Sequence, residues 1–358
     1  MGATRPAILA VSPGDPAGIG PELALMALAR TDPAEAVLRV RAGRKLLERV
    51  SRASGIPFPG VLCISPGEEP PERCGGHVLV DDPFEGECEP GRVSACCGAY
   101  AARQVRTAAQ DVLAGRADAL VTMPLCKESA RLGGCPFPGH TELLASVCGA
   151  KSPPVMAFHS GAVAAGGRCG GLALALATIH EPLARVPSLL DAGGILHVLR
   201  TVHSSFGAMC GGSPRIGVLG LNPHAGENGL IGREEIETIR PAVARAREEG
   251  IDAHGPLVPD AAFSFLAAAI RDPSAAPPFD AYVAMYHDQG LIPFKLAAFG
   301  SAVNVTLGLP IVRTSPGHGT AFDIAWRGKA GFGATGAAIR LAAKMAALRR
   351  QSISMQSP

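Results

Sequence analysis

Three strand-like runs in this sequence each end on a histidine. They are Leu172–His180, Arg215–His224 and Asp280–His287. Ligand sites in α/β proteins collect beyond the carboxyl ends of buried strands, so three such ends could bring three imidazoles together. Three imidazoles with an open fourth position are a catalytic metal arrangement, and zinc is the natural occupant by ligand type. A lone histidine at a strand end is more often a hydrogen-bonded structural residue, and no two of these three are close in sequence.

Asx side chains stand beside two of these histidines. Asn222 lies two residues before His224, and Asp288 directly follows His287. Groups of this kind often hydrogen-bond the second nitrogen of a metal-binding imidazole and fix its orientation. We therefore expect Asn222 and Asp288 to orient the imidazoles.

A second set of polar residues favours a bound anion. Lys295 offers a point charge and Arg313 a bidentate fork, and both suit a phosphate ester. His140 and Thr141 begin a predicted helix, where free amides and the positive end of the helix dipole favour phosphate or carboxylate. With Asn304, these residues predict a site for a small phosphorylated substrate. Taken singly, each charge could be a surface charge, and Thr141 could simply cap its helix.

A glycine-rich segment, Ser12–Glu22, follows the first strand-like run, Ala7–Val11. Glycines between a strand and a helix allow a tight turn and can point amides at an anion. The alternative is a plain turn between strand and helix. The segment is not a G-x-G-x-x-G fingerprint, which disfavours a conventional dinucleotide site.

The elements that would position these residues alternate between short strands and longer helices. This rhythm predicts an α/β, three-layer αβα fold with a mostly parallel sheet. A glycine-rich turn between Val155–Phe158 and Leu172–Thr178 predicts a hairpin, and so an antiparallel part of the sheet. We expect one helix from Pro187 to Phe206, a solvated helix from about Arg233, and a loop that carries Lys295.

Composition excludes several classes of function. The 358 residues are 47% hydrophobic and 18% charged, typical of a globular protein, and the net charge is only +2. That charge and 4% aromatic residues give no nucleic-acid footprint. No signal-like segment or spanning stretch is seen, and the ten cysteines form no C-x-x-C pair. We expect a cytoplasmic protein with reduced thiols.

Five segments together resemble the 4-hydroxythreonine-4-phosphate dehydrogenase family of vitamin B6 (pyridoxine) biosynthesis. They fall in the family's order over roughly residues 7 to 345. The segments are Gly14–Glu22, Pro138–Glu142, Leu221–Glu227, Tyr286–Lys295 and Val303–Pro310.

The resemblance implies a fold like that of the isocitrate/isopropylmalate dehydrogenases, with two lobes and a cleft. We expect residues 1–130 plus 305–358 in the cofactor lobe and 131–304 in the metal and dimer lobe, or one domain over 5–348. It also implies a homodimer whose active site draws on both subunits. We expect a small phosphorylated substrate as the partner molecule, and neither nucleic acid nor a membrane.

The resemblance also implies residue roles. The metal would be zinc, with magnesium, manganese or cobalt as alternatives, and the cofactor NAD or NADP. Either Asp260 or Lys295 would act as the general base. The metal ligands would be His180, His224 and His287; the substrate residues His140, Thr141, Lys295, Asn304 and Arg313; the cofactor residues His318, Gly319 and Asp323.

Four positions depart from the family pattern. Met123 and Cys126 stand where a small residue and Asn or His are common, Gly317 replaces a usual Asp, and Trp326 replaces a usual Gly. The last two lie beside the expected cofactor segment. Rival functions are oxidation of another phosphorylated hydroxy acid such as erythronate 4-phosphate, oxidation of a dihydrodiol, and a metal-dependent hydrolase or aldolase reaction. A phosphate-binding module without catalysis is a further rival, but it would not need the three histidines.

Overall fold

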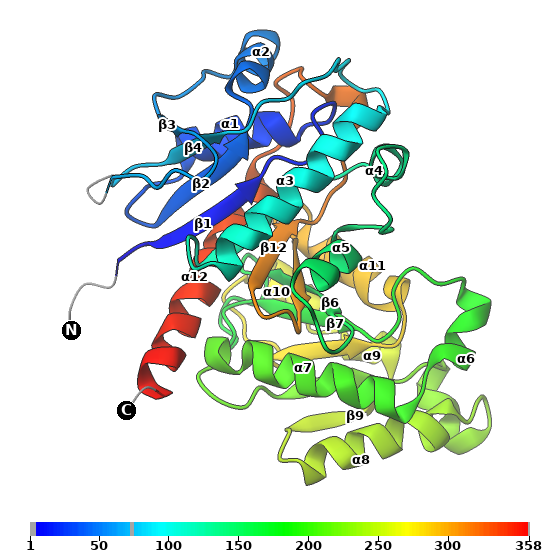
Figure 1. The fold of residues 1–358 in the computed structure, drawn as a ribbon. Coiled ribbons are helices and arrows are strands. Elements are labelled where there is room, and N and C mark those ends of the chain that lie inside the picture. The colour runs from blue at the N-terminus through cyan, green and yellow to red at the C-terminus, as the bar shows by residue number, and fades with distance from the viewer. Residues whose placement is uncertain (1–4, 72–74, 357–358) are drawn as a thin grey trace. The chain divides into compact units, whose positions relative to one another are not determined.

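The computed structural model describes residues 5–71 and 75–356, and contains two compact units (Figure 1). Unit 1 comprises Met1–Pro154 with Leu309–Pro358, and unit 2 is Val155–Gly308. The chain thus leaves unit 1 once and returns to it once. Residues 131–154 belong to unit 1, not to the second lobe as we had expected. The reason is that Leu143 and Leu144 pack in the same apolar cluster as Val105 and Leu120 of that unit.

The described residues of unit 1 form six parallel strands in the order β3-β4-β2-β1-β5-β12. Helix α3 contacts β1, β2 and β5, while α12 contacts β12, β1 and β5. The elements are β1 (Ala7–Ser12), α1 (Gly20–Arg30), β2 (Ala36–Ala42), α2 (Arg44–Ser54), β3 (Leu62–Ile64), β4 (Val78–Asp81), α3 (Ala95–Leu113), β5 (Ala119–Thr122), α4 (Lys127–Leu132), α5 (His140–Val147), β12 (Val312–Pro316), the short 3₁₀ turn η4 (Phe322–Ile324) and α12 (Gly333–Gln356).

Unit 2 also holds six strands, in the order β11-β6-β7-β10-β8-β9. Strand β6 is antiparallel to both of its neighbours, and the remaining pairs are parallel. The elements are β6 (Val155–Ser160), β7 (Leu172–Leu176), η1 (Leu183–Arg185), α6 (Val186–Leu189), α7 (Ala192–Cys210), β8 (Ile216–Leu219), η2 (Pro223–Gly229), the π-turn η3 (Glu235–Ile239), α8 (Arg240–Glu248), β9 (Ala253–Leu257), α9 (Pro259–Ala262), α10 (Leu266–Arg271), β10 (Ala281–Ala284), α11 (His287–Ala298) and β11 (Val303–Leu307).

The alternation of side chains along β7 explains how helices cover unit 2. Leu172, Leu174 and Leu176 pack in one apolar cluster with Leu291 and Phe294 of α11. The alternate residues of a strand point to its opposite face, and α7 also contacts β7. Figure 1 shows α7 lying in front of these strands. The predicted mostly parallel α/β fold with an antiparallel part is confirmed.

Two local predictions about helices need correction. The helix expected over 187–206 is two helices, because Asp191 caps α7 by accepting hydrogen bonds from the amides of Gly193 and Gly194. The loop expected after His287 is helix α11, which contains Pro293 in its interior.

The cysteines do not all stay reduced. Cys169 and Cys210 form a disulfide, with their Cα atoms 4.2 Å apart. Seven other cysteines are free, and Cys74 lies outside the described residues. Among the residues that the structure describes, no helix combines the length and apolar character needed to cross a bilayer.

Candidate active site

Two of the three predicted metal histidines lie side by side in unit 2. Strands β7 and β10 are parallel neighbours, with Tyr282 opposite Leu174, so their carboxyl ends reach the same edge of the sheet. His180 follows β7 and His287 follows β10, and their ring centroids are 5.5 Å apart. The two rings line a cavity of about 410 Å³ with Tyr286, Asp288 and other residues of that edge. The predicted convergence at a sheet edge therefore holds for this pair.

Asp288 fixes the orientation of the His287 ring. Its Oδ1 atom lies 2.6 Å from His287 Nδ1, while Asp288 itself is 71% exposed. An imidazole held in this way through Nδ1 presents Nε2 as the remaining ligand atom. This is the orienting contact expected from the sequence.

Gln289 ties two strand ends together. Its Oε1 accepts a 2.7 Å hydrogen bond from the amide of Met285, and its Nε2 donates a 2.6 Å bond to the carbonyl of Gly220. Thr178 adds a third link, because its hydroxyl donates to the Met285 carbonyl at 2.7 Å. The ends of β7, β8 and β10 are thus bound to one another. We had named Gln289 only as part of the strand-end motif, without this role.

His224 is not among the residues that line the cavity beside His180 and His287. It sits in η2, where five consecutive residues from His224 to Asn228 have positive φ values of 44 to 77°. Its side chain is 66% exposed, and Nδ1 lies 3.7 Å from Glu227 Oε1. Over residues 5–71 and 75–356, no three His, Cys, Asp or Glu side chains are arranged as a metal-binding group. The three-histidine site stays a prediction.

A buried carboxylate holds the segment that carries His224. Glu235 is fully buried, and its Oε1 accepts 2.8 Å hydrogen bonds from the amides of Leu221 and Asn222. The Asn222 side chain donates to the other oxygen at 3.0 Å. The sequence pattern predicted a solvated helix from about Arg233, and this prediction is wrong for Glu235. It also placed Asn222 behind an imidazole, whereas the Asn222 amide contacts Glu234 and Glu235.

In unit 1, the predicted substrate residue His140 lies close enough to the buried guanidinium group of Arg313 to feel its charge. Arg313 on β12 is 3% exposed, and its Nη2 donates a 2.7 Å hydrogen bond to the hydroxyl of Thr122 at the end of β5. Burial lowers the pKa of Arg313 to about 10, so it remains charged at neutral pH. His140 and Thr141 begin α5 in the same unit.

The surroundings of His140 favour its uncharged form by lowering its pKa. Burial first, and then the positive charges of Arg313 and Lys127, hold the pKa of His140 well below its ordinary value of 6.5. Its Nε2 atom is buried and has no hydrogen-bond partner among the described residues. Two cations and an unsatisfied imidazole nitrogen are groups that an anion with several oxygens can satisfy. Sequence reasoning missed Lys127; the polar residue after a predicted strand was the available signal.

The remaining predicted substrate and base residues belong to unit 2. Lys295 and Asp260 are exposed, and Asn304 is partly buried on β11. Lys295 lies eight residues along α11 from His287, a rise of about 12 Å. Lys295 and Asn304 therefore sit in a different unit from Arg313, His140 and Thr141.

The Gly14–Glu22 segment is a tightly bonded turn. The amide of Asp15 donates to the Pro124 carbonyl, that of Ala17 to the Asp15 carboxylate, and that of Ile19 to the Thr320 carbonyl. Gly14 has φ +75°, and a Cβ there would lie 2.2 Å from the Pro124 oxygen. Burial raises the pKa of the Asp15 carboxyl. These amides are engaged within the unit, so the plain-turn alternative describes them better than an anion site.

The predicted cofactor residues precede an unusual tryptophan. His318, Gly319 and Asp323 are all exposed. Trp326 has φ +61°, a value that favours glycine, yet its ring is buried and its Nε1 donates a 3.0 Å hydrogen bond to the Pro16 carbonyl. The Arg49 guanidinium lies 5.5 Å from the ring centroid. These contacts account for a bulky residue at a position where glycine is expected.

The fold and its polar strand ends define an α/β protein of the class whose ligand sites form at the carboxyl edge of a parallel sheet. Residues 40–342 match the family described as pyridoxal phosphate biosynthetic protein PdxA. This chain belongs to that family.

Individual relatives agree with the family match. The chain is 39% identical to 4-hydroxythreonine-4-phosphate dehydrogenase of Trichlorobacter lovleyi, over 98% of this chain and 100% of the relative. A solved structure of the enzyme of that name from Klebsiella pneumoniae is 36% identical with a TM-score of 0.78, covering 95% of this chain and 99% of the other. A terephthalate 1,2-cis-dihydrodiol dehydrogenase structure from Burkholderia xenovorans is 28% identical with a TM-score of 0.60, covering 94% and 97%.

Proposed function

We propose that this chain oxidises 4-phosphooxy-L-threonine with NAD or NADP as the hydride acceptor. The immediate product is 2-amino-3-oxo-4-phosphooxybutanoate, a β-keto acid that decarboxylates to 3-amino-2-oxopropyl phosphate. The observation that carries this proposal is the 39% sequence identity, over 98% of this chain, to a relative named for the activity. The buried Arg313–His140 group supports it, because it suits the phosphate of such a substrate.

The histidines of unit 2 are the proposed metal ligands. His180, His224 and His287 would hold a divalent cation, with zinc favoured by the imidazole donors and magnesium, manganese or cobalt as alternatives. The fit is good for His180 and His287, which face one cavity with Asp288 behind the second ring. His224 is assigned from the family resemblance. A cation there lowers the pKa of a bound hydroxyl and stabilises negative charge on oxygen.

Phosphate recognition is assigned to Arg313, His140 and Thr141, with Lys295 and Asn304 as further ligands. Arg313 supplies a fixed charge with bidentate geometry. Neutral His140 supplies one hydrogen-bonding nitrogen without adding a second buried charge. Contacts to a remote phosphate orient the reacting carbon and so contribute to the rate.

Proton and cofactor handling complete the assignment. Asp260 and Lys295 are the candidates for the base that removes the hydroxyl proton, directly or through water. His318, Gly319 and Asp323 are the proposed contacts of NAD or NADP, which supplies the hydride acceptor when bound. The exposed carboxylate of Asp323 suits the ribose hydroxyls of such a cofactor.

We further propose a homodimer. Ile292 and Leu296 of helix α11, and Phe299 directly after its end, are 66%, 78% and 93% exposed. Their spacing places them on one side of the helix, and such contiguous apolar residues commonly mark an interface. A second copy of this chain would cover them, next to Lys295 on the same helix.

A nicotinamide assay tests the activity. Purified protein is mixed with NAD or NADP and one of three substrates: 4-phosphooxy-L-threonine, erythronate 4-phosphate or a cis-dihydrodiol. Reduced nicotinamide is followed by absorbance, with and without a chelator. We expect the first substrate to give the highest kcat/KM and the chelator to abolish turnover. A preference for either other substrate moves the assignment to that rival, and undiminished turnover after complete metal removal rejects the metal.

A further inference from the structure

Unit 1 contains a cavity of about 390 Å³ at the amino-terminal edge of its sheet. This is the edge opposite to the one that carries the Gly14 turn and Thr122 of the same unit. Its wall includes Ile8, Val37 and Val78, which stand at the amino ends of β1, β2 and β4. The carboxyl ends of the parallel strands β1 and β5 lead instead to the Gly14 turn and Thr122. The cavity is lined by Arg5, Pro6, Ile8, Val37, Arg39, Glu69, Pro70, Gly75, Val78 and Arg116.

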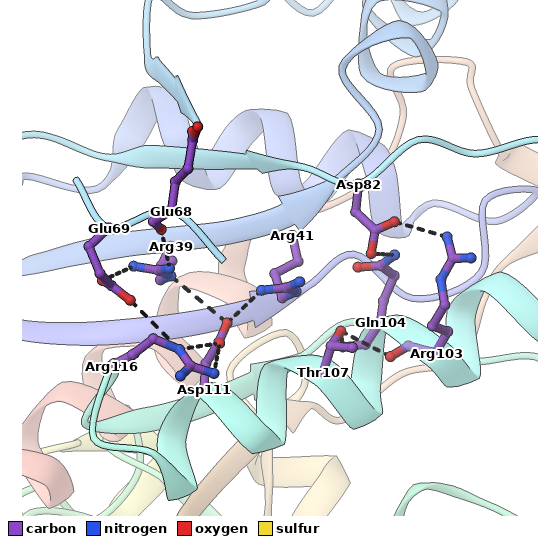
Figure 2. Close-up of polar contacts among 10 residues, drawn as sticks. All are labelled: Arg39, Arg41, Glu68, Glu69, Asp82, Arg103, Gln104, Thr107, Asp111 and Arg116. Atoms are coloured by element: carbon purple, nitrogen blue, oxygen red, sulfur yellow. Dashed lines mark hydrogen bonds and ion pairs between the residues drawn. The ribbon is translucent and has the colours of Figure 1, made fainter. Parts of the chain in front are cut away.

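Arg39 reaches this cavity from inside the sheet (Figure 2). It is 3% exposed, and its Nη1 donates a 3.0 Å hydrogen bond to Glu69 Oε2 while Nη2 donates to the Glu68 carbonyl at 3.1 Å. Its Nε atom is buried without a hydrogen-bond partner among the described residues, 3.8 Å from Asp111 Oδ2. The Glu68 carboxylate accepts from the Ser65 amide and points away from Arg39 in Figure 2.

Positive charge exceeds negative charge around Arg39. Asp111 is shared by Arg41 at 2.8 Å and Arg116 at 2.8 Å, and Arg116 also lies 3.8 Å from Glu69. Three guanidinium groups therefore share two carboxylates. The cavity residue Arg5 and its neighbour Arg350 share the single carboxylate of Asp118. Among the described residues that line the cavity, Arg5, Arg39 and Arg116 carry positive charge and Glu69 carries negative charge, an excess of two positive charges.

Glu69 is the carboxylate that a ligand could replace. It bridges Arg39 and Arg116 across the cavity, yet its side chain is 56% exposed, so it can turn into water at little cost. Asp111 cannot, because it is 3% exposed and holds Arg41. The excess of two charges matches a phosphate dianion, and guanidinium forks are the groups that bind phosphate oxygens in pairs.

We propose that this cavity binds a small phosphate monoester with an apolar body, distinct from the proposed substrate. Its phosphate replaces the Glu69 carboxylate between Arg39 and Arg116. Its apolar body packs on the wall formed by Pro6, Ile8, Val37, Pro70 and Val78. A volume of about 390 Å³ is that of a pocket for a small molecule.

Binding to the full-length protein tests the proposal, with phenyl phosphate as the probe. Titration calorimetry should give tighter binding of phenyl phosphate than of inorganic phosphate, and no binding of phenol. Arg116→Ala removes one exposed fork and should weaken phenyl phosphate about tenfold, the value of one charge-assisted contact. Glu69→Gln removes the competing carboxylate and should tighten binding. Arg92→Ala and Glu89→Gln, in an exposed ion pair elsewhere in unit 1, are matched controls that should change nothing.

Arg116→Ala and Glu69→Gln are expected to change the affinity for phenyl phosphate in opposite directions. Neither substitution alters the Arg313 group, so this result distinguishes binding in the cavity from binding at Arg313. Equal affinities for wild type, Arg116→Ala and Glu69→Gln would overturn the proposal, as would absence of any phenyl phosphate binding. Crystals soaked in tungstate give a second measurement, with an anomalous peak expected between Arg39 and Arg116. A peak only beside Arg313 would also reject it. Dehydrogenase turnover measured with each variant keeps this outcome separate from the proposed function.

Discussion

His180 and His287 are 107 positions apart in the chain, yet their ring centroids lie 5.5 Å from each other. The parallel pairing of β7 and β10 produces this proximity, because it brings both carboxyl ends to the same edge. Any chemistry assigned to these imidazoles therefore depends on one strand pair and on the links through Thr178 and Gln289.

The first prediction concerns the metal. His180→Ala, His224→Ala and His287→Ala should each reduce bound zinc and lower kcat/KM by at least about a hundredfold, because each removes a ligand. Metal content by plasma mass spectrometry and the nicotinamide assay are the measurements. His203→Ala, on α7, is the control and should retain both. Full metal content in His224→Ala would exclude this histidine as a ligand.

The second prediction isolates the orienting contact. Asp288→Asn should weaken zinc affinity about 10- to 100-fold without unfolding the protein, because Asp288 is exposed and its Oδ1 holds His287 Nδ1. Asp252→Asn is a matched control, since Asp252 holds His254 at the same 2.6 Å distance. Competition with a chromogenic chelator measures the affinity. Equal losses in the two variants would point to a general effect rather than to orientation.

The third prediction is a pH dependence of stability. The folded protein holds the pKa of His140 below 6.5, so the unfolded chain binds a proton more readily. The free energy of unfolding should therefore fall as pH drops below 6.5, with a His140 contribution of up to about 1.4 kcal/mol per pH unit. Urea unfolding of His140→Gln between pH 7 and 5 should show a shallower loss, and the exposed-residue control His318→Gln an unchanged one. Identical slopes for wild type and His140→Gln would contradict this prediction.

The fourth prediction uses the backbone of Trp326. Trp326→Ala should lower the free energy of unfolding by about 3 to 5 kcal/mol through lost packing. Trp326→Gly should be less damaging by about 1 kcal/mol, because glycine adopts φ +61° without strain. Urea unfolding followed by circular dichroism measures both. Arg106→Ala and Arg106→Gly in α3 should show the reverse order, and the same order at both positions would remove the backbone explanation.

The fifth prediction concerns the apolar side of α11. Phe299→Asp should convert the proposed dimer to a monomer, because it places a charge at the most exposed of the three apolar residues, directly after the end of the helix. Sedimentation equilibrium reports the mass. Leu113→Asp, at an exposed apolar residue of α3, should leave the assembly unchanged. A monomeric wild type would reject the dimer itself.

Much of the fold could be predicted from the sequence, because buried strands here are short apolar runs between breakers. The strands before His180 and His287 could be predicted in this way, and so could the antiparallel hairpin. The order of strands in each sheet was not, since pairing between distant segments leaves no local pattern. Helix α11 was mistaken for a loop because Pro293 usually breaks a helix.

The candidate site was less predictable than the strands that carry it. The left-handed turn at His224 has no strong signal, because it includes Ala225 and Glu227, residue types that rarely adopt positive φ. Glu235 looked like one charge among several on a solvated helix, and only the tertiary structure buries it against the Asn222 segment. Residue type alone could not separate these two cases.

The interrupted course of the chain through unit 1 has a consequence for synthesis on the ribosome. Unit 2 is continuous, so Val155–Gly308 can close its sheet as soon as β11 has emerged. Unit 1 must wait for β12, which pairs with β5, and for α12, which covers β1, β5 and β12. The amino-terminal segment of unit 1 is therefore completed only after unit 2, and its apolar strands need protection until β12 and α12 have been synthesised.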